Sequence, residues 1–268
     1  MKNPKISIVT PSYNQGDFIG DAIQSLLDQG YENFEHIIID AVSTDNTHEV
    51  VSRYPHVTFI SEPDEGQSDA LNKGFKRATG DIVGWLNADD FYMPDTFNKV
   101  LKVLEDPKVD AVYSNVRFID GEGNYTRDLI EHKVVKWLAW FYCYIPSTTF
   151  FFKREIMDDG PFIDKDFHIS MDMELFARLL HKGYKFQYVN DFFASFRWHG
   201  GNKSIESKEV EDIRMKEGVT ILNRYSPLNL SMSKFNLSMY GKVQAASKVF
   251  RAMAKTQNYK YKLKDWAR

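Results

Sequence analysis

The chain has 268 residues, a formal net charge of −3, 43% hydrophobic residues and 15% aromatic residues. This composition suits one large globular domain, with or without an appendage, and excludes a disordered chain or a repeat array. The single cysteine, Cys143, excludes an intrachain disulfide and a cysteine-cluster metal site. No apolar run approaches the roughly 20 residues of a membrane-spanning helix, and the N-terminus enters a strand pattern without a signal peptide. We therefore expect a cytoplasmic protein.

The first half of the chain alternates between short apolar runs and helical periodicity. The expected strands are residues 5–10, 34–39, 57–60 and 82–86, and the expected helices are residues 17–29, 45–53, 66–78 and 94–105. Gly80 is expected to end the third helix as its C′ residue. This alternation predicts βαβ units and a parallel, doubly wound sheet.

After Pro107 the pattern changes to a hairpin and mixed elements. The expected elements are a β-hairpin over 109–130, an aromatic helical segment at 133–144, a strand at 148–152, a helix at 171–181, strands at 184–189 and 192–198, and a helix at 206–225. The aromatic segment fits either the core or the floor of a site for a sugar acceptor.

The tail at residues 227–268 differs in charge from the rest of the chain. Residues 231–268 contain nine Lys or Arg and one acid, a formal +8 against −11 for the remainder. Apolar residues in helical 3-4-3 spacing predict a basic amphipathic helix; they are Val243, Ala246, Phe250 and Met253. Such a helix could lie on the anionic inner face of the cell membrane, or it could pack on the core or on a second subunit of a homodimer.

Polar residues follow each expected strand of the first half, at the edge where open α/β sheets bind ligands. The run 82–86 ends in Asn87-Ala88-Asp89-Asp90, and paired carboxylates there either hold a divalent cation or cap the next helix. The chain has neither the GxGxxG nor the GxxxxGK[ST] phosphate-binding motif, which disfavours a Rossmann dehydrogenase and a P-loop enzyme. A nucleotide bound here would need a metal at Asp89 to neutralise its phosphates.

Five motifs occur together in order and spacing. They are TPSYN (10–14), Asp40 with STDNT (43–47), GQSDALNKG (66–74), TGDIVGWLNADD (79–90) and MDMELFARL (171–179). Over residues 5–204 the chain thereby resembles the inverting family 2 glycosyltransferases of the GT-A fold, of the kind that builds bacterial surface polysaccharides. The resemblance implies an α/β fold with a Rossmann-like, doubly wound, mostly parallel sheet, an added β-hairpin and acceptor region, and a C-terminal helical tail. It divides the chain into a nucleotide-sugar-binding half (1–106), an acceptor-binding half (107–226) and the tail (227–268).

The resemblance also implies roles for individual residues. The donor-binding residues would be Thr10, Pro11, Tyr13, Asp40, Gly66, Asp69, Asn72, Asn87, Ala88 and Asp89. Among them, Asp40 would contact the nucleobase, while Asp69 and Asn72 would face the ribose and diphosphate from one side of a helix. Asp89, together with His199, would bind Mg²⁺ or Mn²⁺. The motif MDMELFARL (171–179) would supply Asp172 as the catalytic base, which takes the proton of the attacking hydroxyl.

Three departures from the family pattern bear on these roles. Asn87 stands in place of the first Asp of the metal-binding motif, so the affinity for metal would be lower. Ala41 and Val42 stand where glycine is usual, so the turn there would need a different shape. Met171 stands where an acid usually precedes the base. The departures concern nucleotide fit and metal affinity and leave the expected fold unchanged.

The expected activity is metal-dependent transfer of a hexosyl or N-acetylhexosaminyl group from a nucleoside diphosphate sugar to a hydroxyl of a glycan or a lipid-linked acceptor. UDP is the family's common carrier, and no nucleic-acid partner is expected. The rivals are a nucleotidyltransferase that makes a sugar nucleotide and a non-catalytic module that binds one. At single positions, Asp172 could instead be an exposed helix-terminal acid, Glu174 could compete as the base, and His199 could be structural.

Overall fold

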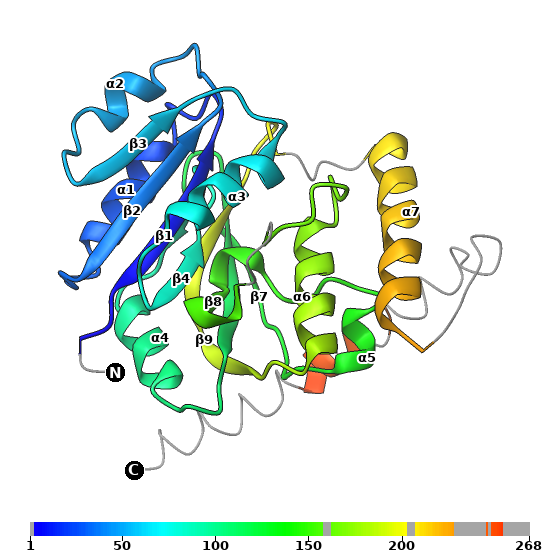
Figure 1. Ribbon diagram of the computed structural model, residues 1–268. Helices are drawn as coiled ribbons and strands as arrows, with labels where there is room; N and C mark the ends of the chain where they lie inside the picture. The colour runs from blue at the N-terminus through cyan, green and yellow to red at the C-terminus, as the bar shows by residue number, and fades with distance from the viewer. Residues whose placement is uncertain (1–2, 158–161, 203–206, 228–244, 246–247, 254–268) are drawn as a thin grey trace.

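The computed structural model describes residues 3–157, 162–202, 207–227, 245 and 248–253. Within these residues a curled sheet of nine strands has the order β3–β2–β1–β4–β8–β6–β9–β5, with β7 paired to β6 (Figure 1). The strands are β1 (Ile6–Ser12), β2 (Phe34–Asp40), β3 (Val57–Ser61), β4 (Ile82–Trp85), β5 (Phe91–Tyr92), β6 (Ala111–Asp120), β7 (Tyr125–Leu129), β8 (Phe151–Lys153) and β9 (Phe186–Trp198).

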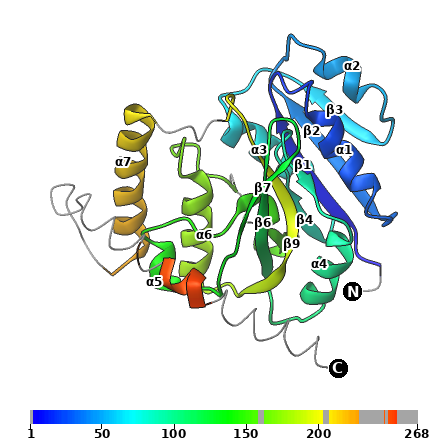
Figure 2. The same ribbon diagram turned by 180° about the vertical axis from the view of Figure 1, so that it is seen from behind.

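Helices cover both faces of this sheet. They are α1 (Ile19–Leu27), α2 (Thr47–Val51), α3 (Gln67–Arg77), α4 (Thr96–Leu104), α5 (Lys136–Ala139), α6 (Met171–Lys182) and α7 (Lys208–Tyr225), with 3₁₀ turns at Ser147–Thr149 and Arg154–Ile156. The apolar sides of α1, α2 and α4 pack on one face, and those of α3 and α6 pack on the other. Both views show α7 on the outside of α6 (Figures 1 and 2). The result is the layered α/β domain that the alternating pattern predicts.

The first four strands are parallel, as predicted: β1 pairs with β2 and β4, and β2 pairs with β3. Every residue of β1 is buried, because its side chains alternate between the two helical layers, with Ile8 in the cluster of α1 and Val9 in the cluster of α3. The register sets Ser12 beside Asp40. The carboxyl ends of these strands therefore meet at one edge of the sheet.

The second half joins the sheet through β8, which is antiparallel to both β4 and β6. The predicted hairpin is present as β6 and β7. The two strands expected at 184–189 and 192–198 are a single strand, β9, whose register against β6 shifts on either side of Asn115. Asn190 and Asp191 lie at this irregularity, and the register with β6 skips both residues. In the sequence this polar pair indicates a break between two strands.

The expected role of Gly80 as a helix C′ residue is wrong. Helix α3 ends at Arg77, and its C-cap residue Ala78 has an extended backbone. Gly80 lies against β1, where a Cβ atom would come within 2.7 Å of the Lys5 carbonyl oxygen and 2.8 Å of the Ser7 nitrogen. Two backbones approach too closely here for any side chain, which explains the glycine.

The tail is described at residue 227 and at residues 245 and 248–253, of which the last seven are helical, and the rest of it lies outside the described residues. Phe250 packs against His132 and Trp137, and Arg251 pairs with both oxygens of Glu131 at 2.7 and 3.0 Å. This part of the tail therefore packs on the core, the second of the two alternatives. In the described part of the chain, the helices are too short or too polar to span a membrane.

Candidate active site

A cavity of about 940 Å³ lies at the carboxyl ends of β1, β2 and β4. Its opposite wall comes from the start of α6, the segment before it and the end of β9. Seven of the predicted site residues line it: Pro11, Tyr13, Gly66, Asn87, Ala88, Asp89 and Asp172. Among the described residues that line the cavity there are three carboxylates and no Lys or Arg. The cavity is large enough for a nucleotide sugar together with part of a second substrate.

The loop after β2 borders the cavity through Ala41 and Val42. Val42 has a backbone φ of +58°, in the left-handed region that β-branched residues avoid. The turn therefore takes a positive φ without a glycine, and a difference between its shape and that of the family's turn stays a prediction. Strain of this kind costs of order 1–3 kcal/mol and concentrates at ligand-binding sites.

Asp40, at the end of β2, is fully buried and does not line the cavity. Its carboxylate accepts hydrogen bonds from the Ser43 hydroxyl at 2.5 Å, the Ser43 N–H at 2.9 Å and the Ser61 hydroxyl at 2.9 Å. These bonds fix the turn that carries Val42. Contact between Asp40 and a nucleobase stays a prediction.

Besides Asp40, three further predicted donor-binding residues lie outside the cavity lining. Thr10 is buried and bonds to a histidine of β2 at 2.9 Å. The Asn72 amide donates to the Ile163 carbonyl and accepts the Ile163 N–H, both at 2.8 Å, while Asp69 pairs with two lysines at 3.2 Å. The expectation that Asp69 and Asn72 face the cavity is therefore wrong. In the aromatic segment 133–144, Trp140, Phe141 and Tyr144 pack in the core and against α7, and Trp137 is half-exposed beside Phe250. No residue of the segment lines the cavity, so it forms no cavity floor.

Ser12 and Gln15 are two of the cavity residues to which the sequence analysis gives no role. Among the described residues, the Ser12 hydroxyl and Gln15 Oε1 are buried without a hydrogen-bond partner, and both residues line the cavity. A buried polar atom without a partner is destabilising, so a polar ligand that bonds to these atoms would gain affinity. The available signal was their place in the loop TPSYNQ, next to residues that the family resemblance singles out.

The loop after β4 carries two adjacent carboxylates, Asp89 and Asp90, with different surroundings. Asp90 is fully buried and accepts hydrogen bonds from Asn87 Nδ2 at 3.0 Å and from Thr148 Oγ1 at 3.1 Å. The N–H of Arg197 donates a third bond to it at 2.9 Å. Burial, followed by the charge of Asp89, raises the pKa of Asp90 well above its usual value. Asp90 thus belongs to the frame of the site.

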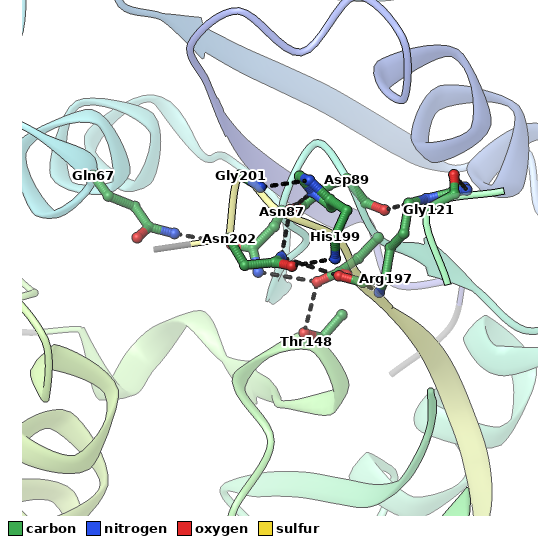
Figure 3. Close-up of polar contacts among 10 residues, drawn as sticks. Gln67, Asn87, Asp89, Gly121, Thr148, Arg197, His199, Gly201 and Asn202 are labelled. Carbon is green, nitrogen blue, oxygen red and sulfur yellow. Dashed lines mark hydrogen bonds and ion pairs between the residues drawn. The ribbon is translucent and has the colours of Figure 1, made fainter. Parts of the chain in front are cut away.

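Asp89 lies at the cavity wall beside two side chains from the segment that follows β9. Its Oδ2 is 3.1 Å from His199 Nε2 and accepts a hydrogen bond from Asn202 Nδ2 at 3.2 Å (Figure 3). The helix-cap alternative for this loop is wrong, since α4 begins only at Thr96, with Asp95 as its N-cap. No cluster of three or more His, Cys, Asp or Glu side chains that could bind a metal occurs among the described residues.

Arg197 connects the chain segments around Asp89, and the sequence analysis gives it no role. Its side chain is 4% exposed and donates from Nε to the Asp89 carbonyl at 3.0 Å and from Nη1 to the Gly121 carbonyl at 3.1 Å (Figure 3). Its Nη2 pairs with Asp21 of α1 at 2.6 Å. One guanidinium therefore connects β9 to α1, to the β6–β7 hairpin and to the loop after β4, where the sequence predicts a metal site.

Asp172 is the second residue of α6 and lines the cavity. It is not the exposed helix-terminal acid of the alternative reading, because it is partly buried in the cavity wall and this burial raises its pKa. Glu174 is fully buried, pairs with Arg178 at 2.9 Å and accepts a hydrogen bond from Tyr225. Because it does not line the cavity, Glu174 is not placed to compete as the base.

Comparison with known proteins places this fold and site in a family. The model of glycosyl transferase family 2 matches residues 7–179, which is more than half of the chain. The chain therefore belongs to glycosyl transferase family 2, and it has the GT-A glycosyltransferase fold.

Two relatives illustrate the range of similarity. An uncharacterized glycosyltransferase of Nostoc sp. (strain PCC 7120) is 26% identical over 241 residues, which cover 82% of this chain and 74% of that protein. The putative teichuronic acid biosynthesis glycosyltransferase TuaG of Bacillus subtilis is 37% identical over 107 residues, covering 38% of this chain and 42% of that protein.

Solved structures share the fold at low sequence identity. TarS of S. aureus in complex with UDP has a TM-score of 0.63 at 17% identity, and the match covers 84% of this chain and 67% of that one. A mannosyltransferase from Pyrobaculum calidifontis, in complex with GDP-Man and Mn²⁺, has a TM-score of 0.59 at 20% identity, covering 96% of this chain and 84% of that one.

Proposed function

We propose that this protein moves a hexosyl or N-acetylhexosaminyl group from a nucleoside diphosphate sugar to a hydroxyl of a glycan or lipid-linked acceptor, with inversion at the anomeric carbon. The observation that carries the proposal is the cavity that joins the loops after β1 and β2 to Asp89 and, on the opposite wall, to Asp172. One end suits a nucleoside, the middle a diphosphate, and the wall of α6 the attacking hydroxyl.

The choice of donor and product rests on the relatives. TarS was solved with UDP and with UDP-GlcNAc, which makes UDP-sugars the first donors to test, and the bound GDP-Man of the mannosyltransferase makes GDP-sugars the second. Relatives named for teichuronic acid biosynthesis and as chondroitin synthase support a role in assembling a polysaccharide.

Asp172 is the proposed base. A sugar hydroxyl is a weak nucleophile, so a carboxylate in hydrogen-bond reach must take its proton while the oxygen attacks the anomeric carbon and the bond to the diphosphate breaks. The raised pKa of Asp172, caused first by burial, makes its carboxylate a better proton acceptor. Its position across the cavity from Asp89 suits attack from the side opposite the leaving group.

A divalent cation is part of the proposal. The described lining residues supply carboxylates but no Lys or Arg, so a diphosphate would bind only with added positive charge. The Asp89 carboxylate, with the His199 imidazole beside it, would hold Mg²⁺ or Mn²⁺ together with oxygen ligands from the donor and water. When bound, such an ion stabilises the departing diphosphate. Asn202 and Arg197 hold the Asp89 loop in place for it.

The test of the reaction is release of nucleoside diphosphate from a panel of UDP- and GDP-sugars with Mn²⁺ present. Asp172→Asn should retain UDP affinity by calorimetry and lose about 100-fold or more in kcat. The matched control is Asp166→Asn, an exposed aspartate outside the cavity lining, which should behave as wild type. A kcat in Asp172→Asn close to that of wild type would contradict its role as the base.

The same panel separates the rival functions. A nucleotidyltransferase would release pyrophosphate from a nucleoside triphosphate and a sugar phosphate, and a non-catalytic module would bind donors without cleaving any. For the metal, excess chelator should abolish turnover, and Mn²⁺ should restore it in wild type but not in Asp89→Asn. Full activity in excess chelator would overturn the metal requirement.

A further inference from the structure

The carboxylate of Glu217, in the middle of α7, binds the chain that leads into α6. Its Oε1 accepts the N–H of His168 at 2.6 Å, and its Oε2 accepts the N–H groups of Ile169 at 3.1 Å and Ser170 at 2.7 Å. Glu217 is only 8% exposed. Three consecutive backbone N–H groups therefore converge on one buried side chain from a helix 47 residues later in the sequence.

This contact replaces local capping of α6. The N-cap residue Ser170 makes no side-chain cap bond, although helix N-termini carry N–H groups that need acceptors. A carboxylate at this end also interacts favourably with the positive end of the helix dipole. Glu217 thus fixes the backbone two residues before Asp172.

Helix α7 holds the same stretch of chain at further points. Arg224 pairs with Asp164 at 2.6 Å and lies over the ring of Phe167, 5.2 Å from its centre. At the other end of the stretch, the hydroxyl of Tyr225 donates to Glu174. The stretch from 164 to 174 supplies one wall of the cavity, including His168, Ile169 and Asp172. Its position is therefore set by α7 as well as by the sheet.

We propose that Glu217 is the positioning residue for Asp172: by binding the N–H groups of residues 168–170 it fixes where the base stands relative to the donor. This inference rests on the proposed function, because it takes Asp172 as the base. Glu217 does not line the cavity and acts through the backbone it binds. A displacement of the base by about 1 Å is enough to lower the rate of a positioned reaction about 100-fold.

The test compares Glu217→Ala and Glu217→Gln with the control Glu211→Ala. Glu211 is an exposed glutamate of the same helix, so its removal changes the charge and composition of α7 equally without touching α6. The glutamine keeps the length and one carbonyl oxygen, and so it can retain part of the contact if the alanine variant fails to fold. Each full-length variant is examined by hydrogen exchange over residues 168–173 and by kcat and KM for donor hydrolysis with the donor that wild type turns over.

We expect faster exchange over residues 168–173 and a 10- to 100-fold lower kcat in Glu217→Ala, a smaller loss in Glu217→Gln, and a donor KM within about twofold of wild type in both. A contact that only stabilises the fold would lower the fraction of active enzyme. In that case kcat per folded molecule would be the same in Glu217→Ala, Glu217→Gln and wild type. Unchanged exchange would overturn the contact, and faster exchange with unchanged kcat would overturn the positioning role. If wild type turns over no donor, the proposed function fails, while hydrogen exchange still reports on the contact itself.

Discussion

The buried ion pair between Glu131 and Arg251 gives the stability of the protein an unusual dependence on pH. Glu131 is 1% exposed, and Arg251 of the tail binds both of its carboxylate oxygens. Burial raises the pKa of Glu131 from 4.5 to about 7, and this effect outweighs the lowering by the guanidinium. The folded protein therefore retains a proton that the unfolded chain releases at lower pH.

The sign and size of the effect follow from this difference. Below pH 4.5 the glutamate is protonated in both states and adds no pH dependence. As the pH rises from 4.5 to about 7 the unfolded state ionises first, so the free energy of unfolding falls. At about 1.4 kcal/mol per pKa unit the loss reaches about 3 kcal/mol and is constant at higher pH.

Glu131→Gln isolates this contribution because it keeps the shape of the side chain and cannot ionise. The free energy of unfolding is measured by urea denaturation of both proteins at intervals between pH 4.5 and 8. Wild type minus variant should fall by about 3 kcal/mol across this interval, and subtraction removes the titration of other groups such as Asp172. Arg251→Met should raise the pKa of Glu131 further and carry the fall to higher pH. Parallel curves for wild type and Glu131→Gln would refute the reasoning.

Three further substitutions test other parts of the structure by thermal unfolding. Val42→Gly should relieve the strain of a positive φ and raise Tm by about 2 °C. A lower Tm would show that the loop is not strained. Gly74→Ala should destabilise by about 1–3 kcal/mol, because the added Cβ would lie 2.2 Å from Val9 Cγ1; a higher Tm would mean that α3 shifts freely. Arg197→Lys should cost about 1–3 kcal/mol, since an ammonium cannot reach all the acceptors of the planar guanidinium; unchanged stability would show that those bonds contribute nothing net.

The layered fold was accessible from the sequence because its first half repeats strand and helix at regular spacing. The same regularity predicts that Asp89 lies at the sheet edge, since it follows a short apolar strand directly. The prediction that Asp172 faces the same site depends on the family resemblance, because nothing in the local sequence pattern indicates which way the start of α6 faces. Chain order thus specifies the elements better than it specifies their contacts.

The errors have a common physical origin in long-range contacts. Spacing puts Asp69 and Asn72 on one side of α3, but the backbone at Ile163, 91 residues after Asn72, covers that side. Glu174, which the sequence offers as a rival base, is likewise enclosed by Arg178 and Tyr225 and does not reach the cavity. A local pattern gives the face of a helix and cannot give what covers that face.

The position of β9 between β6 and β5 has a consequence for synthesis of the chain on the ribosome. The Arg197 N–H reaches Asp90 across a sequence separation of 107 residues. At roughly 5–20 residues per second, the carboxylate of Asp90 emerges about 5–20 s before its backbone partner. Contacts between residues so far apart in sequence form slowly because closing the loop between them costs chain entropy. We therefore expect the contacts around Asp89 to be among the last in the sheet to form. A nascent chain that stops short of β9 therefore lacks the contacts of Arg197, His199 and Asn202 with the loop after β4, and that loop can take its final form only once β9 has been made.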